Sequence, residues 1–212
     1  MKKTIIFDLD GTLTDSGEGI INCAIYALER YNLPIPSREE LRVFVGPPLT
    51  DTFVKFGIKP EDAVQAVEVF RERYIPIGMY ENKLYPGIKE LLEALRGEGH
   101  ILCIATSKLE SMAREVLRYF HIAEYFHHIC GAAPDHSRDT KEQVISYLLG
   151  QCDSEYPLVM VGDTAFDIIG AKAHHIPAIG VAWGYGLVEE MQIAGAAAIV
   201  YDTKELLEEL QK

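Results

Sequence analysis

Long apolar stretches are missing from this sequence: no run approaches the roughly 18 consecutive apolar residues that a membrane-spanning helix needs. The apolar run after Met1-Lys2-Lys3 is too short for the core of a signal peptide and meets Asp8 at once. Clusters of lysine and arginine are missing too, and the net charge is −12. Because nucleic-acid and membrane-surface proteins need clustered positive charge, the sequence argues against both classes. We expect a cytoplasmic protein.

Cysteine is scarce as well, and no two cysteines form a C-x-x-C pair. The four are Cys23, Cys103, Cys130 and Cys152. Their wide spacing and mostly apolar neighbours are typical of reduced core residues. With 212 residues and 48% hydrophobic content, the chain can form one full domain with a smaller insertion. We expect it to fold alone, as a monomer, with a homodimer left open.

Short apolar runs that suit strands recur along the chain, and from the second onward they alternate with helical patterns. The runs are 4–8, 100–105, 127–130, 157–161, 176–181 and 197–200. Apolar residues in 109–120 and 140–149 keep the spacing of half-buried crossover helices. The alternation predicts an α/β fold with a Rossmann-like parallel sheet.

Residues 15–80 break the alternation, because they carry helical patterns and no convincing strand. We predict a helical cap domain over 15–80, inserted after the first strand into a core domain of residues 1–14 and 81–212. Because the insertion follows the first strand directly, we expect it to lie at the carboxyl edge of the sheet and to act as a lid. Its loop Gly46-Pro47-Pro48 is either a rigid helix connector or a loop facing the substrate.

Polar residues gather where the predicted strands end. They are Asp8 and Asp10 after the first strand, Thr106 and Ser107 after the second, Lys141 at the start of the helix over 140–149, and Asp163 and Asp167 after the strand over 157–161. Parallel strands end at one edge of the sheet, where open α/β sheets place their active crevices. Because neighbouring carboxylates repel, they call for a cation or a shared proton. We expect one shared site.

This set of side chains supplies what phosphoryl transfer needs. Asp8, Asp163 and Asp167 can hold Mg²⁺ through oxygen atoms, directly or through water. The cation reduces the repulsion among the carboxylates and neutralises charge on a phosphate. Asp8 is then free to attack phosphorus and form an aspartyl-phosphate, while Asp10 protonates the leaving oxygen and later deprotonates water.

The phosphate itself needs donors and a positive charge. The hydroxyls of Thr106 and Ser107, with free N–H groups at the opening of the helix over 109–120, suit an anion. Lys141 offsets the charge of the substrate and of the crowded acids. The alternative for Thr106 and Ser107 is a helix cap, and the alternative for Asp167 is an acid that merely favours the first turn of a helix.

Four separated motifs together resemble those of the haloacid dehalogenase superfamily. They are D-x-D-G-T at Asp8 to Thr12, Thr106-Ser107, Lys141, and G-D-x-x-x-D at Gly162 to Asp167. The resemblance covers essentially the whole chain, with the helical insertion where the family's C1-type caps lie. It implies a Mg²⁺-dependent phosphatase of the phosphoglycolate phosphatase and 5′-nucleotidase-like branch. Asp10 argues against carbon–halogen chemistry, since the dehalogenases of the family lack this second aspartate.

The resemblance also implies a role for each motif residue. Asp8 is the nucleophile and a Mg²⁺ ligand, Asp10 the general acid/base and a ligand through its backbone carbonyl, Thr106 a phosphate ligand, Lys141 the stabilising cation, Asp163 a metal ligand, and Asp167 a ligand or a water-mediated partner. The substrate is expected to be a small phosphorylated metabolite: phosphoglycolate, a nucleoside monophosphate, a sugar phosphate or pyrophosphate. A sugar phosphomutase and a non-catalytic phosphate-binding module stay as alternatives.

Two histidine pairs and the segment around Trp183 also have purely structural interpretations. His127-His128 and His174-His175 look like metal ligands, but adjacent side chains diverge and no matching acid or cysteine spacing accompanies them. We interpret them as surface or edge residues. Trp183 and Tyr185, around the glycines of the Gly184-x-Gly186 turn, either touch a ligand or simply cover the edge of the sheet.

Overall fold

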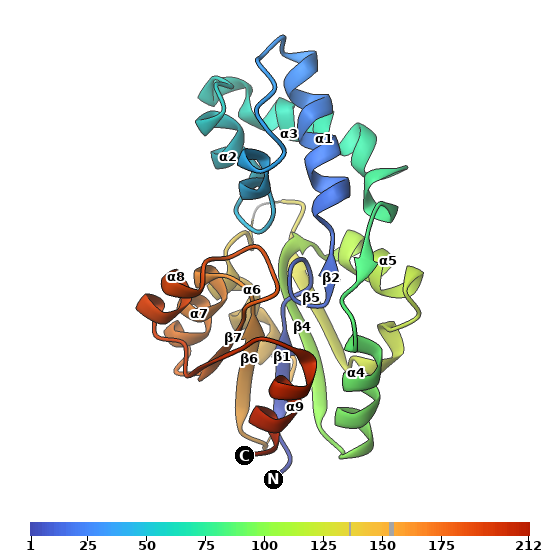
Figure 1. Cartoon of the computed structure of the whole chain (residues 1–212), viewed down its shortest axis with the longest axis vertical. Coiled ribbons are helices and arrows are strands. Elements are labelled where there is room, and N and C mark those ends of the chain that lie inside the picture. The colour runs from blue at the N-terminus through green and yellow to red at the C-terminus, as the bar shows by residue number, and fades with distance from the viewer. Residues whose placement is uncertain (136, 153–154) are drawn as a thin grey trace. The chain divides into compact units, whose positions relative to one another are not determined.

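The computed structural model describes residues 1–135, 137–152 and 155–212 and divides into two compact units (Figure 1). The core unit comprises Met1–Thr14 and Leu84–Lys212, and the helical unit comprises Asp15–Lys83. The segments at the two boundaries, β2 (Thr14–Asp15) and β3 (Lys83–Leu84), form a small two-stranded sheet. Across the described residues, every helix is too short or too polar to span a bilayer.

The core unit is built on a parallel sheet, which has six strands within the described residues, in the order β5-β4-β1-β6-β7-β8. The strands are β1 (Thr4–Phe7), β4 (Ile101–Leu109), β5 (His128–Ala132), β6 (Leu158–Gly162), β7 (Ala178–Val181) and β8 (Ala198–Val200). Neighbouring strands run parallel throughout, which confirms the predicted α/β fold class. Because the strand order reverses on either side of β1, its carboxyl end opens into the crevice where such sheets bind ligands.

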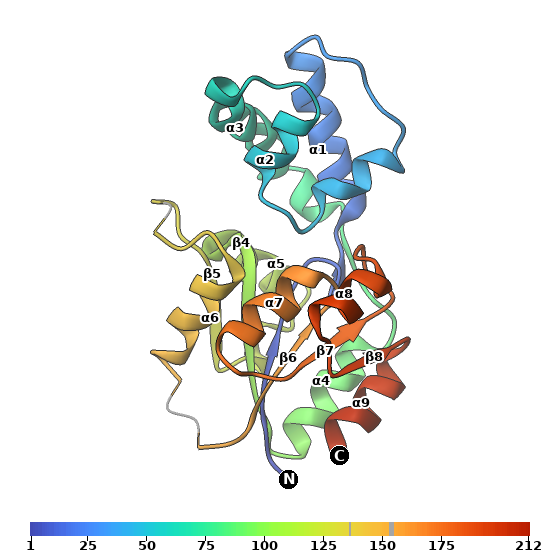
Figure 2. The ribbon, with the colours of Figure 1, turned by 90° about the vertical axis from the view of Figure 1, so that its left-hand side faces the viewer.

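Helices cover both faces of this sheet: in Figure 1, α6, α7 and α8 lie on one side of the strands and α4 and α5 on the other, and Figure 2 looks onto the side that carries α6, α7 and α8. One group comprises α4 (Ile88–Gly97), α5 (Glu110–Tyr119) and α9 (Thr203–Gln211), with the short 3-10 turn η4 (Ala123–Tyr125). The other group comprises α6 (Lys141–Leu149), α7 (Ala165–Ala173) and α8 (Val188–Ala194). With both faces covered, the strands are apolar throughout, as their sequences predict.

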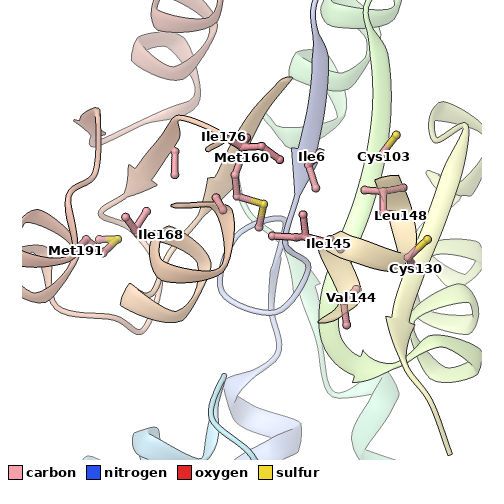
Figure 3. Close-up of a cluster of buried hydrophobic side chains, with 13 residues drawn as sticks. Ile6, Cys103, Cys130, Val144, Ile145, Leu148, Met160, Ile168, Ile176 and Met191 are labelled. Atoms are coloured by element: carbon pink, nitrogen blue, oxygen red, sulfur yellow. The ribbon is translucent and has the colours of Figure 1, made fainter. Parts of the chain in front are cut away.

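Figure 3 shows the apolar cluster between the sheet and the second group of helices. Ile6 of β1 points into it, and Met160 of β6 lies beside Ile145 of α6. The other labelled members are Cys103, Cys130, Val144, Leu148, Ile168, Ile176 and Met191. Each such side chain contributes about 1.5–3 kcal/mol when it is fully buried. All four cysteines of the chain are reduced thiols, as their spacing predicts.

The helical unit consists of helices and short 3-10 turns between its boundary strands. These are α1 (Gly17–Arg30), η1 (Glu40–Phe44), α2 (Leu49–Lys55), η2 (Pro60–Asp62), α3 (Ala63–Tyr74) and η3 (Gly78–Tyr80). Phe53 of α2 makes edge-on ring contacts with Phe44 and Phe70, so the unit has a small core of its own. Val64 is 59% exposed and lies outside the buried face of α3, because it is about 100° around the helix from Ala63.

Candidate active site

The turn after β1 carries the first pair of acids. Asp8 is buried, and its N–H still bonds the carbonyl of Val161 at 2.9 Å, so β1 and β6 stay paired up to this residue. The chain then folds back, with the carbonyl of Leu9 accepting from the N–H of Leu13 at 2.9 Å. Gly11 adopts φ +88°, and a Cβ there would lie 2.2 Å from Asp163 Oδ2. Only glycine fits this position, because the backbone is left-handed and the next acid is already packed against it.

The three predicted metal-binding acids lie together. One carboxylate oxygen each from Asp8, Asp163 and Asp167 falls within 4.8 Å of the others. This is the one such group of histidine, cysteine and acidic side chains found among the described residues, so the histidine pairs form no metal cluster there. All three acids are buried, Asp167 completely. A buried group of carboxylates at this spacing suits a hard divalent cation.

Lys141, the first residue of α6, contacts two of these three acids. Its Nζ is 2.7 Å from Asp8 Oδ1 and 2.8 Å from Asp167 Oδ1, and it also donates to the carbonyl of Ala105 at 3.0 Å. One ammonium against the three carboxylates of the cluster leaves a formal charge of −2. A divalent cation cancels that charge, so the donor set and the charge both fit a metal such as Mg²⁺.

Asp167 occupies the first turn of α7, as one interpretation of the sequence predicts, and also lies in the acid cluster. Its Oδ2 accepts the N–H of Thr164 at 3.0 Å and the hydroxyl of Thr164 at 2.8 Å, which is a capping arrangement at the start of α7. Its Oδ1 is the atom that contacts Lys141. The cap fixes the orientation of the carboxylate, so the other oxygen always faces the cluster.

Asp163 is held on both of its oxygens. Thr12 donates its hydroxyl to Oδ1 at 3.1 Å, and the backbone N–H of Tyr185 donates to Oδ2 at 2.8 Å. The sequence predicts neither contact with Asp163. Thr12 stands out only as the last residue of the D-x-D-G-T motif, and Tyr185 only as a residue that touches a ligand or covers the sheet edge, because its bond to Asp163 is made by the backbone.

Burial and mutual repulsion shift the protonation of the cluster in the metal-free protein. Burial raises the pKa of Asp8 to about 6, although Lys141 acts in the opposite direction. Burial, with the nearby charges of Asp167 and Asp8, raises the pKa of Asp163 to about 8. Burial alone would lower the pKa of the Lys141 ammonium, but Asp167 and Asp8 outweigh it and raise that pKa. Lys141 is therefore charged, and Asp8 and Asp163 keep their protons to a higher pH than free aspartates do.

The stability of the metal-free protein is expected to fall as pH rises, and Asp163→Asn is expected to weaken that dependence. The pKa of Asp163 rises from 3.8 to about 8 on folding, so between these values the folded state holds more protons. The free energy of unfolding then decreases with rising pH, by at most about 1.4 kcal/mol per pH unit for one proton. Denaturant titrations in a chelator from pH 5 to 8 measure the slope for both proteins. Parallel curves would contradict the shift at Asp163.

Thr106 and Ser107, the predicted phosphate-binding residues, lie within strand β4 and not, as the sequence predicts, at the start of the following helix. β4 continues to Leu109, and no side-chain cap is present at the start of α5, so the helix-cap alternative for Thr106 and Ser107 is wrong. The register shifts between Ala105 and Leu109, where β4 spends more residues than its partner β5. Such a bulge redirects side chains and frees N–H groups from the ladder. Thr106 is buried there, and its Oγ1 accepts the N–H of Lys108 at 3.3 Å.

Asp10 has a partner that the sequence did not predict. Lys108 Nζ lies 2.7 Å from Asp10 Oδ2, and the two side chains are only 8% and 11% exposed. The bulge in β4 places Lys108 over the turn after β1. Asp10 does not join the three-acid group, so its side chain is separate from the candidate metal ligands in this structure.

Comparisons with known proteins agree with this geometry. Residues 5–181 match the family model of the haloacid dehalogenase-like hydrolases. The chain is 42% identical over 193 residues to the 5′-nucleotidase of Pseudomonas aeruginosa, covering 89% of this chain and 86% of that protein. It is 43% identical over 185 residues to the tyrosine-protein kinase PtkA of Mycobacterium tuberculosis, covering 87% of this chain and 63% of that protein.

The fold matches solved structures equally well. The structure described as a predicted phosphatase from Clostridium acetobutylicum superposes with a TM-score of 0.94 at 38% identity, covering 100% of this chain and 99% of that one. These comparisons confirm the predicted resemblance, the fold class and the assignment as a phosphatase. The chain belongs to the haloacid dehalogenase-like hydrolases.

Proposed function

We propose that this protein is a cytoplasmic, Mg²⁺-dependent phosphatase that hydrolyses a small phosphomonoester through an aspartyl-phosphate intermediate. The observation that carries the proposal is the cluster of Asp8, Asp163 and Asp167 around Lys141. Its formal charge of −2 suits a divalent cation, and Asp8, at the end of β1, is the carboxylate that we propose as the nucleophile beside that cation. A carboxylate nucleophile next to a divalent cation favours a phosphoryl-transfer enzyme over a protein that only binds phosphate.

Asp8, Asp163 and Asp167, with the backbone carbonyl of Asp10, would hold the metal. A bound Mg²⁺ supplies charge neutralisation for the phosphate and for the acids. Lys141 holds one oxygen of Asp8 at 2.7 Å and thereby orients the carboxylate for attack. Because Lys141 and these three acids are buried, their electrostatic interactions act in a medium of low dielectric.

The chemical steps are assigned to two aspartates. An oxygen of Asp8 attacks phosphorus while the ester bond to the leaving oxygen breaks, and Asp10 gives that oxygen its proton. Asp10 then takes a proton from water as the water oxygen attacks phosphorus, which releases phosphate and restores Asp8. Thr106, with Ser107 and the N–H groups of the β4 bulge, binds the remaining phosphate oxygens. Lys108, 2.7 Å from Asp10 Oδ2, holds the Asp10 side chain in place beside the site.

Residues 15–83 serve as a cap in this proposal and exclude bulk water during formation of the intermediate. The likeness to a 5′-nucleotidase, at 42% identity, supports a nucleoside monophosphate as substrate, with phosphoglycolate as the other type. The protein is proposed to work as a monomer, without nucleic acid or membrane.

A phosphate-release assay over a panel of metabolites tests the proposal. The panel holds nucleoside 5′-monophosphates, phosphoglycolate, sugar phosphates and pyrophosphate. We expect release from one class, reduced at least about 100-fold by a chelator and restored by Mg²⁺. Sugar-phosphate isomerisation without net release would identify a mutase. Absence of turnover on every substrate, or release that survives the chelator, would contradict the proposal.

A further inference from the structure

The segment Trp183–Gly186, which follows β7, packs against the site and is unused by the mechanism above. We propose that this segment is a positioning clamp for Asp163, and that it sets the affinity of the site for its divalent cation. The inference rests on the metal site of the proposed function. It assigns to these residues a role that neither touches the substrate nor transfers a proton.

The clamp acts on Asp163 through a backbone hydrogen bond. The N–H of Tyr185 donates to Oδ2 at 2.8 Å, opposite the hydroxyl of Thr12, which donates to Oδ1 at 3.1 Å. A carboxylate has about four acceptor positions, so one bond on each oxygen leaves positions free for a metal. The two bonds together stop the carboxylate from rotating.

Trp183 ties the two partners of Asp163 together. Its indole N–H donates to the carbonyl of Thr12 at 3.0 Å, although 171 residues separate them in sequence. Its ring lies 6.4 Å from the ring of Tyr85, centroid to centroid, which supports the indole from another side. The clamp and the turn after β1 therefore brace the same carboxylate as one connected unit.

The two glycines let the clamp approach this closely. A Cβ on Gly184 would lie 2.4 Å from Asp163 Oδ2 and 2.5 Å from the carbonyl oxygen of Gly11. A Cβ on Gly186 would lie 2.1 Å from the carbonyl oxygen of Asp163. Any side chain at Gly184 must push the Asp163 carboxylate away, because the backbone of Gly11 blocks the other direction. The Gly-x-Gly spacing is thus explained by contact with the acid.

Partners that orient a metal ligand affect metal affinity directly. A carboxylate that is already aimed loses no rotational freedom when the metal binds, and replacing such a partner typically costs 10–100-fold in affinity. Loss of the clamp should therefore weaken metal binding while the fold, the nucleophile and the phosphate contacts remain. A purely structural role for the segment would lower stability without this selective effect.

Manganese serves as the probe, because free Mn²⁺ is counted directly by electron paramagnetic resonance and it shares the oxygen ligands of Mg²⁺. The test variant is Gly184→Ala. Its matched control is Gly97→Ala, since a Cβ there meets no atom within 4 Å apart from its chain neighbours and the backbone of its own helix. Trp183→Phe removes the bond to Thr12 but keeps an aromatic ring, and Asp163→Asn removes the ligand itself.

Gly184→Ala is expected to weaken Mn²⁺ binding by at least about 10-fold, and Trp183→Phe by several-fold, while Gly97→Ala binds as the wild type does. Excess Mg²⁺ should restore the turnover of Gly184→Ala. If Gly184→Ala fails to fold, Trp183→Phe decides. Wild-type affinity in the folded variants, with binding lost only in Asp163→Asn, would overturn the clamp. Wild-type affinity in Asp163→Asn as well would instead overturn the metal site of the proposed function.

Discussion

Asp8→Asn is expected to reduce phosphate release by at least about 10⁴-fold, the scale of loss when a catalytic nucleophile is removed. The amide is a poor nucleophile and forms no aspartyl-phosphate. Lys141 keeps its contacts with Asp167 at 2.8 Å and with the carbonyl of Ala105 at 3.0 Å, so the local structure survives. Steady-state assays at saturating Mg²⁺ measure the loss.

The control for Asp8→Asn removes one negative charge elsewhere. Glu208 is an exposed residue of α9, so the variant Glu208→Gln should retain wild-type turnover. Asp8→Asn should unfold in a single cooperative transition near the wild-type temperature, because the cluster has more carboxylates than ammonium groups. Turnover in Asp8→Asn within about 10-fold of the wild type would remove Asp8 from the role of nucleophile.

Lys141→Met is expected to damage both stability and turnover. Removing one partner of a buried ion pair typically costs about 3–5 kcal/mol, and here it leaves three buried carboxylates without their ammonium. Turnover should fall by at least about 10²-fold, since the phosphate also loses a positive charge. Denaturant titrations and steady-state assays at pH 8 measure the two effects.

The pH dependence of the stability of Lys141→Met shows whether the loss comes from the missing charge or from altered side-chain packing. Without the ammonium, the carboxyl pKa values rise further, so the folded state holds more protons and its stability falls more steeply as pH rises. Stability should therefore recover in part at pH 5. Lys89→Met, at an exposed position of α4, should match the wild type throughout. A Lys141→Met protein with wild-type stability and slope at pH 8 would refute the ion-pair argument.

Prediction from sequence worked where the signal is local. The strands are buried and apolar, so their runs stand out, and β1 over Thr4–Phe7 and β6 over Leu158–Gly162 lie within about a residue of the predicted ranges. The helix Lys141–Leu149 lies within the range 140–149 that its apolar spacing predicts, and the structure adds the cap by Thr140. These features depend on residues only a few positions apart.

Prediction failed where the partner is distant. The bulge in β4 depends on how Ala105 and Leu109 pair with β5, and strand pairing leaves no mark in the sequence of one strand. The pairing of Lys108 with Asp10 spans 98 residues. The clamp on Asp163 works through the N–H of Tyr185, which every residue except proline possesses.

Four polar motifs at strand ends suffice to predict from sequence which groups come together, because parallel strands bring their carboxyl ends to one edge. How those groups are held follows from contacts that form only in the folded protein. Lys141 between Asp8 and Asp167, and Asp163 between Thr12 and Tyr185, are contacts across long stretches of chain. Their distances and burial exist only once the sheet has assembled, since the unfolded chain keeps each side chain in water.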